Sequence, residues 1–191
     1  MRTAIFGGTF DPVHSAHLEM AGRAADQFRL DRVLFIPAGN PPHKRADASF
    51  EHRYRMVELA CAADPRFIAS RLEEGTGKSY SIDTIERVSA ANADAQGALF
   101  FIIGSDAFAE IQTWRRWEDV IRAVDFIVVA RPGHEIANPP GARVHRLDSV
   151  ELPVSSSDIR DALARGESPP ELPPAIADYI RDRGLYESST R

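Results

Sequence analysis

The stretch TAIFGGTFDPVHSAH, residues 3–17, decides the fold of this chain. Thr3–Phe6 is a short apolar run of the kind that forms a buried strand. Two glycines follow, and after a proline the pattern becomes helical, with Leu18, Ala21 and Ala25 on one face. A buried strand that passes through a tight glycine turn into a helix is typical of an α/β domain.

The rest of the chain continues this alternation. Further strands are predicted at Val33–Ile36, Phe67–Ser70, Leu99–Ile103, Phe126–Ala130 and Val144–Leu147. Further helices are predicted at Phe50–Cys61, from a cap at Ser81 through Val88, and at Trp117–Val124, Ser157–Ala164 and Pro174–Arg183. Apolar strands between amphipathic helices indicate a doubly wound α/β fold with a mostly parallel sheet, Rossmann-like in class. Ligands of such folds bind beyond the carboxyl ends of the strands, at the topological switch point.

Length and composition limit the classes of protein. The chain has 191 residues, which favours one domain over residues 1–191, with a small helical part from about residue 155. The net charge is −5. A basic surplus is missing, so we expect neither a nucleic-acid partner nor a membrane partner. No apolar leader or spanning segment is visible, so a cytoplasmic protein is the default expectation. The single cysteine, Cys61, falls at helical spacing and is expected in the core.

Two histidines mark the start of the first helix. His14 and His17 are three residues apart, so both side chains can point at the same spot. Helix N-termini carry unpaired N–H groups that attract anions, and imidazoles can donate hydrogen bonds to a phosphate. The alternatives are an ordinary turn with two incidental histidines, or a zinc site, which would lack a third ligand nearby in the sequence. The pattern favours a phosphate cradle without a protein-held metal.

Two other segments can also meet a phosphate. In residues 154–160 serines begin a helix, where their hydroxyl and N–H groups can bind an anion, and Arg160 lies one turn further on. The alternative is an ordinary capped helix. In residues 37–44 two prolines stiffen a loop that holds Asn40 and Lys44 over the switch point. The alternative for this loop is a simple surface turn.

The fourth predicted strand leads to further candidates. Asp106 follows Leu99–Ile103 closely, where an acidic residue can accept hydrogen bonds from ribose hydroxyls. Trp114 offers a flat face for stacking on a ring, although most tryptophans belong to the core. Trp117 is then expected to pack inward from its helix.

These segments together resemble one family. Residues 7–17 resemble the (T/H)xGH signature of the nucleotidyltransferase superfamily, in the GGTFDPxHxGH form of bacterial nicotinate mononucleotide adenylyltransferases. Residues 37–44, 79–84 and 154–160 resemble the PxxxPPHK, SYTxDT and ISSTxIR segments of the same family. Departures from the pattern include Ala16 and Ser105, which replace the usual glycine and alanine, and Ser81, which replaces a threonine. The similarity covers nearly the whole chain.

The resemblance implies a reaction and a set of site residues. AMP would pass from ATP to the phosphate of nicotinate mononucleotide, with Mg²⁺ carried mainly on the ATP phosphates. The residues that it assigns to catalysis are His14, His17, Lys44 and Arg160. Those assigned to ATP are Gly7, Gly8, Thr9, Phe10, Gly104, Asp106, Ser156 and Ser157. Those assigned to the acceptor are Asn40, Tyr80, Ser81 and Trp114.

Other functions stay open at this point. The same transfer could use nicotinamide mononucleotide or phosphopantetheine as the acceptor. A nucleotide-binding regulator without catalysis, and a protein-interaction module that binds no ATP, are alternatives from other classes. The sequence also leaves a homo-oligomer open.

Overall fold

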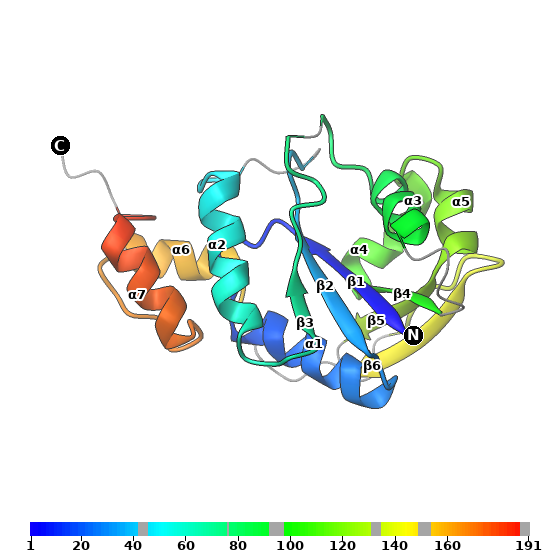
Figure 1. Ribbon diagram of the computed structural model, residues 1–191, viewed down its shortest axis with the longest axis horizontal. Coiled ribbons are helices and arrows are strands. Elements are labelled where there is room, and N and C mark those ends of the chain that lie inside the picture. The colour runs from blue at the N-terminus through cyan, green and yellow to red at the C-terminus, as the bar shows by residue number, and fades with distance from the viewer. Residues whose placement is uncertain (42–45, 76, 92–97, 131–134, 149–153, 188–191) are drawn as a thin grey trace.

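Six parallel strands form the centre of the protein in a computed structural model, which describes residues 1–41, 46–75, 77–91, 98–130, 135–148 and 154–187 (Figure 1). The strand order is β3-β2-β1-β4-β5-β6, and every neighbouring pair is parallel. The strands are β1 Thr3–Gly8, β2 Arg32–Pro37, β3 Phe67–Ala69, β4 Leu99–Gly104, β5 Asp125–Ala130 and β6 Arg143–Asp148. The predicted doubly wound fold is confirmed, and the described strands contain no antiparallel pair.

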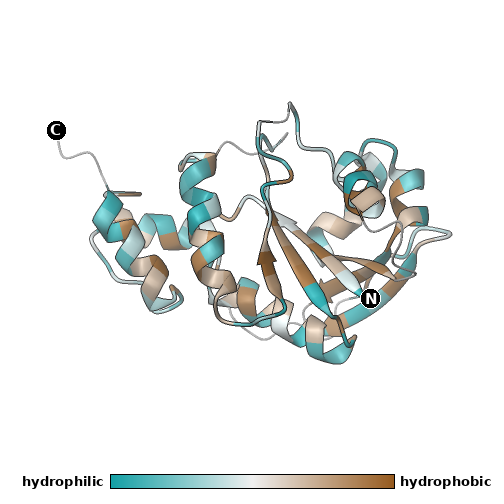
Figure 2. Cartoon of the chain, viewed as in Figure 1, coloured by the Kyte–Doolittle hydropathy of each residue, from teal (hydrophilic) through white to brown (hydrophobic). Residues whose placement is uncertain are grey.

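Helices cover both faces of the sheet. Alternate residues of a strand point to opposite faces, so Phe100 and Ile102 join one buried cluster while Phe101 and Ile103 join the other. The first cluster is covered by α1 Ser15–Gln27, α2 Phe50–Cys61, α6 Ser156–Ala164 and α7 Pro174–Arg183. The second is covered by α3 Ser81–Ala91, α4 Ser105–Ala109 and α5 Trp117–Ala123. Figure 2 shows apolar strands inside and polar residues on the outer helix surfaces.

Local signals set several helix ends. Helix α2 has the predicted bounds, and its N-cap Ser49 accepts a hydrogen bond from the His52 N–H group. Helix α7 begins with a proline and ends before Gly184, which adopts the left-handed conformation (φ 57°). Cys61 is buried, and burial raises its pKa to about 12, which fits the expected core role. None of the helices in the described ranges combines the length and apolarity needed to cross a bilayer.

The segment between β4 and α5 differs from the prediction. The chain forms α4 and a short 3₁₀ turn, Ile111–Thr113, where no element was predicted. One turn of helix is too short to show a periodic pattern, although Phe108 and Ile111 do anchor this segment in the core. Ser81 is the first residue of α3 rather than its cap, and α6 starts at Ser156.

Strand β1 is the topological switch point of the sheet. The chain moves outward through β2 and β3 on one side of β1, and through β4, β5 and β6 on the other. The loops after β1 and β4 therefore separate at their carboxyl ends and leave room for a ligand. The segments predicted to bind ligands at residues 7–17, 37–44 and 104–106 begin at the carboxyl ends of β1, β2 and β4.

Candidate active site

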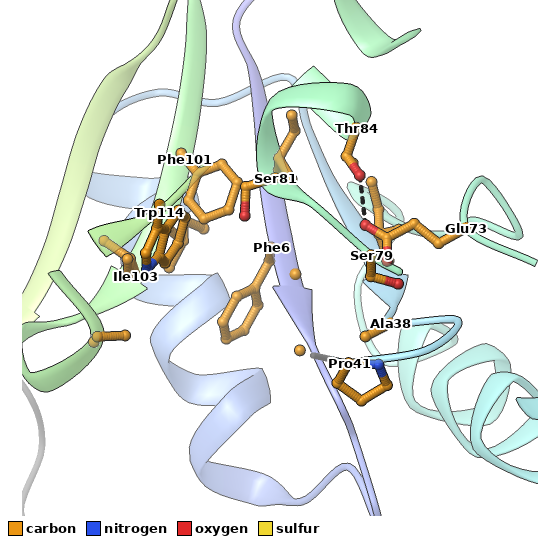
Figure 3. Close-up of a pocket in the computed structure, with 17 residues that line it drawn as sticks. Phe6, Ala38, Pro41, Glu73, Ser79, Ser81, Thr84, Phe101, Ile103 and Trp114 are labelled. Carbon is orange, nitrogen blue, oxygen red and sulfur yellow. Dashed lines mark hydrogen bonds between the residues drawn. The ribbon is translucent and has the colours of Figure 1, made fainter. Parts of the chain in front are cut away.

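A cavity of about 240 Å³ opens at the switch point (Figure 3). Strands β1 and β4, the loop after β2, the start of α3 and the segment after the 3₁₀ turn all contribute to its lining. The predicted site residues among its lining are Gly7, Gly8, Ser81, Gly104 and Trp114. The structure thus brings residues predicted for ATP and residues predicted for the acceptor to one cavity.

One side of the cavity is apolar and aromatic. Trp114 meets the edge of Phe101 with ring centroids 6.1 Å apart, and Ile103 lies beside them in Figure 3. Both Trp114 and Trp117 are partly buried and pack against the second core cluster, but of the two only Trp114 lines the cavity. A flat ring can therefore lie against Trp114 inside the cavity.

The opposite side is polar and is held together by a buried carboxylate. Glu73 is 8% exposed, accepts a hydrogen bond from the Thr84 hydroxyl at 2.5 Å and accepts another from the Gly39 N–H group at 3.4 Å. The Asn40 N–H group donates to Ser79 Oγ at 3.1 Å, and the Ser79 N–H group donates to the Asn40 carbonyl at 3.1 Å. These contacts join the loop after β2 to the start of α3. The sequence prediction missed Glu73, because a glutamate in a polar run carries no sign of burial.

Tyr80 lies beside the cavity rather than along its lining. Its neighbours Ser79 and Ser81 line the cavity, while the Arg115 guanidinium lies 4.7 Å from the centre of the Tyr80 ring. Arg115 also approaches Asp83 at 3.7 Å. Tyr80 therefore joins α3 to the segment that carries Trp114, and its backbone is the part nearest to the cavity lining.

The turn after β1 depends on close packing. A Cβ atom added at Gly8 would lie 3.1 Å from the Phe10 ring, closer than side chains normally approach. Phe10, not a glycine, adopts the left-handed conformation (φ 51°). Its side chain is 2% exposed and meets the edge of the His17 ring at 5.1 Å. Phe10 supports His17 from the core, so its side chain is not available to a nucleotide.

The two histidines lie together at the start of α1. Their ring centroids are 3.8 Å apart. His14 is the N-cap residue, and its backbone N–H group donates to His17 Nδ1 at 3.2 Å. A neutral imidazole that accepts at Nδ1 carries its proton on Nε2. His17 therefore presents an N–H donor at Nε2, which suits a phosphate oxygen.

Burial keeps both imidazoles uncharged near neutral pH. Burial lowers the pKa of His14 to about 4, and His14 itself is 3% exposed. Burial and the neighbouring His14 lower the pKa of His17 well below its usual range. Among the described residues, His14 Nδ1 is the one buried side-chain polar atom without a hydrogen-bond partner. A buried polar atom without a partner is rare in folded proteins and is a candidate for a functional position.

Lowering the pH from about 6.5 to about 4 is expected to destabilise the protein through these histidines. An unfolded histidine has a pKa near 6.5, whereas folded His14 has a pKa of about 4. Between these values the unfolded chain binds more protons than the folded chain, so the free energy of unfolding decreases as the pH is lowered. Urea unfolding at several pH values tests this, and His14→Gln should lose less stability over the same window. An equal loss in wild type and variant would contradict the account.

The N-terminus of α6 is tied to the loop before α1. Ser155 caps α6 and shares hydrogen bonds with Asp158. The Ser156 hydroxyl donates to the Pro12 carbonyl at 2.9 Å, and Arg160 Nη1 donates to the Asp11 carbonyl at 2.7 Å. Two helix N-termini therefore converge on one loop. Each helix N-terminus favours an anion, so two of them close together can bind neighbouring phosphates of one ligand.

Arg160 is already engaged in this structure. Its Nε lies 2.6 Å from Asp47 Oδ2, and its Nη2 donates to Ser157 Oγ at 3.3 Å. Together with the bond to the Asp11 carbonyl, these contacts occupy three of its five N–H groups. Two donors remain for an anion, and the guanidinium plane is fixed before any ligand arrives.

The other predicted residues lie around this centre or outside the described chain. Asp106 is exposed in the first turn of α4, just beyond β4. The Thr9 carbonyl accepts a hydrogen bond from Arg53 at 2.8 Å, so this residue belongs to the packed turn. Lys44 lies outside the described residues. In the described ranges no cluster of three or more His, Cys, Asp or Glu side chains is arranged to hold a metal ion.

Comparisons with known proteins agree with this picture. A family model described as cytidylyltransferase-like matches residues 5–162. A protein of Solibacter usitatus named "probable nicotinate-nucleotide adenylyltransferase" is 59% identical over 188 residues, which cover 97% of this chain and 100% of the relative. A protein of Thermus thermophilus with the same name is 43% identical, with the same coverage of both chains.

Solved structures share the fold. The Plasmodium falciparum nicotinic acid mononucleotide adenylyltransferase in complex with NaAD matches with a TM-score of 0.81 and 19% identity, covering 97% of each chain. A nicotinate-nucleotide adenylyltransferase structure from Vibrio parahaemolyticus matches with a TM-score of 0.70 and 18% identity, covering 99% of this chain and 98% of that one. Fold, sequence and site geometry agree, and the chain belongs to the cytidylyltransferase-like family as a member of its nicotinate-nucleotide adenylyltransferase branch.

Proposed function

We propose that this protein transfers AMP from ATP to nicotinate mononucleotide and releases nicotinate adenine dinucleotide and pyrophosphate. One observation carries the proposal: a ring-sized cavity with Trp114 on its wall lies at the same switch point as the His14–His17 pair. The names of the relatives support it, since those proteins are called nicotinate-nucleotide adenylyltransferases. A cytoplasmic location stays a prediction from the sequence.

The reaction is a direct displacement at phosphorus. A phosphate oxygen of nicotinate mononucleotide forms a bond to the α-phosphorus of ATP. The bond from that phosphorus to the oxygen bridging to the β-phosphorus breaks, and pyrophosphate leaves. No protein nucleophile is needed, because positioning and stabilisation of charge supply most of the catalysis in such transfers.

The histidines would stabilise the transferring group. His17 Nε2–H and the buried His14 ring lie on one helix start, so each neutral imidazole would donate its one N–H group to the α- and β-phosphates. Ser156, Ser157 and the two remaining donors of Arg160 would hold the leaving pyrophosphate. Lys44, from the loop after β2, would approach the same phosphates.

Mg²⁺ would arrive as part of the MgATP substrate. Asp11 lies in the loop between β1 and α1, here called the phosphate loop, and its carboxylate already accepts hydrogen bonds, while Asp47 pairs with Arg160. The ion would therefore take its ligands from phosphate oxygens and water. When bound, it would neutralise part of the charge on the two anionic substrates.

The acceptor ring would lie against Trp114, with its carboxylate near the start of α3. Ser81 lines the cavity and is the first residue of α3, whose N-terminal N–H groups favour a negative charge. This arrangement favours the acid over the amide, because only nicotinate carries a full charge at that position. It also favours a pyridine nucleotide over phosphopantetheine, which has no flat ring for Trp114.

Glu73→Gln is expected to raise KM for nicotinate mononucleotide about tenfold with a smaller effect on kcat. The amide has one acceptor oxygen in place of two and carries no charge, so the contacts to Thr84 and Gly39 that link the two segments framing the cavity are weakened. Steady-state kinetics with saturating ATP measure this. Glu74→Gln is the matched control, because exposed Glu74 pairs with Arg71 outside the cavity. Equal KM values for the two variants would remove Glu73 from the acceptor site.

Pyrophosphate release tests the function itself. We expect release from MgATP with nicotinate mononucleotide, and much slower release with nicotinamide mononucleotide at equal concentration. A preference for the amide or for phosphopantetheine would preserve the chemistry and overturn the acceptor. Calorimetric binding of ATP without release would indicate a nucleotide-binding regulator, and absence of binding an interaction module.

A further inference from the structure

Asp11 connects four segments of the chain. It is 3% exposed, and its carboxylate accepts the Tyr186 hydroxyl at 2.6 Å, the Asp47 N–H group at 2.6 Å and the Ala48 N–H group at 3.2 Å. Its carbonyl accepts a hydrogen bond from Arg160. A carboxylate bound by three donors is fixed in orientation and contributes strongly to the order of its partners.

The partners of Asp11 are parts of the phosphate site. His14 follows Asp11 by three residues at the start of α1. Asp47 lies directly after the loop segment that carries Lys44 in the sequence, and its own side chain pairs with Arg160 at 2.6 Å. Arg160 is therefore held by the backbone of one aspartate and the side chain of another. A movement of Asp11 would shift its carbonyl, which binds Arg160, and its carboxylate, which binds the Asp47 backbone, so both contacts of Arg160 would change.

Tyr186 reaches Asp11 from the far end of the chain. It follows α7 and adopts the left-handed conformation (φ 65°), which costs a non-glycine residue about 1 kcal/mol. Gly184, two residues earlier, is also left-handed. These two positions turn the chain after α7 so that the Tyr186 hydroxyl meets Asp11. A strained conformation persists where the surrounding structure determines it, and often marks a functional contact.

We propose that Tyr186 is a positioning residue for ATP: its hydroxyl fixes the Asp11 carboxylate, and Asp11 in turn holds Asp47 and Arg160 in the geometry that binds phosphates. The inference rests on the proposed function for its substrate. It couples the last turn of the described chain to the N-terminal phosphate loop. The geometry assigns no contact between Tyr186 and the substrates themselves.

Tyr186→Phe removes one hydroxyl and keeps the ring. We expect KM for ATP to rise and kcat/KM for ATP to fall about tenfold, the usual order for losing a hydrogen bond to a charged group. KM for nicotinate mononucleotide should stay within about twofold, because the acceptor cavity does not contact this cluster. Tyr179→Phe is the matched control. The Tyr179 hydroxyl lies 3.0 Å from His52 Nδ1 on α2, so this variant also removes one hydroxyl that bonds to a distant segment, but one that does not contact Asp11.

Two further readouts separate a positioning role from a general loss of stability. Thermal unfolding of both variants shows whether they remain folded at the assay temperature. Calorimetric titration with MgATP, without any acceptor, should show weaker binding by Tyr186→Phe alone. If wild type binds ATP but forms no dinucleotide, the proposed function fails while this titration still tests Tyr186. Unchanged ATP binding and kinetics in Tyr186→Phe, or equal changes in both variants, would overturn the inference.

Discussion

Replacing His17 by alanine is expected to lower kcat about 100- to 1,000-fold, with a much smaller change in KM for nicotinate mononucleotide. The structure gives the reason: the His14 backbone occupies His17 Nδ1, so Nε2–H is left as a fixed donor at the phosphate site. A donor that strengthens as charge develops in the transition state acts on kcat rather than on acceptor binding. Steady-state kinetics with both substrates varied provide the measurement.

Two companion variants sharpen the His17 test. His17→Gln keeps an N–H donor and should recover part of the lost rate. His52→Ala removes a histidine whose side chain bonds to Tyr179, away from His17, and it should leave kcat within about twofold. An unchanged kcat in His17→Ala would remove His17 from the reaction.

Replacing Arg53 by methionine is expected to lower the free energy of unfolding by about 3 kcal/mol. Arg53 is 2% exposed on α2, and it donates to the Ala48 carbonyl at 3.2 Å and to the Thr9 carbonyl at 2.8 Å. Its charge also interacts with the buried Asp11 carboxylate. Methionine fills similar space but leaves two buried carbonyl groups without their donor and removes the positive charge that interacts with Asp11, and each of these losses costs energy.

Arg55→Met is the matched control for Arg53, because it changes the same residue type two positions later on α2. Arg55 is exposed and pairs with Glu58 on the helix surface, so the expected loss is below about 0.5 kcal/mol. Urea unfolding of both variants gives the comparison. Equal losses would contradict the claim that the Arg53 contacts hold the phosphate loop together.

The sequence predicted the fold well because its signals are local. Apolar runs identified the long strands, and the helical spacing of the apolar residues from Phe50 to Cys61 predicted the bounds of α2. The spacing of His14 and His17 predicted that both rings share one helix start, which the structure confirms. Helix α4 was missed because a five-residue element carries no periodicity.

The residues that hold the site in place could not be predicted from sequence patterns. Glu73 differs from its neighbour Glu74 only by its place in the fold. Tyr186 and Asp11 are 175 residues apart, and nothing local links them. Phe10 was predicted to bind ATP, yet its side chain lies in the core beneath His17, because its left-handed backbone turns it inward. Contacts of this kind depend on how distant segments pack.

The most direct test of the proposed reaction follows oxygen atoms. Nicotinate mononucleotide labelled with ¹⁸O on its phosphate would be incubated with MgATP and the protein, and the products analysed by mass spectrometry. Direct attack on the α-phosphorus predicts nicotinate adenine dinucleotide that keeps the whole label, together with unlabelled pyrophosphate. Label in pyrophosphate, or absence of the dinucleotide, would contradict the proposed adenylyl transfer.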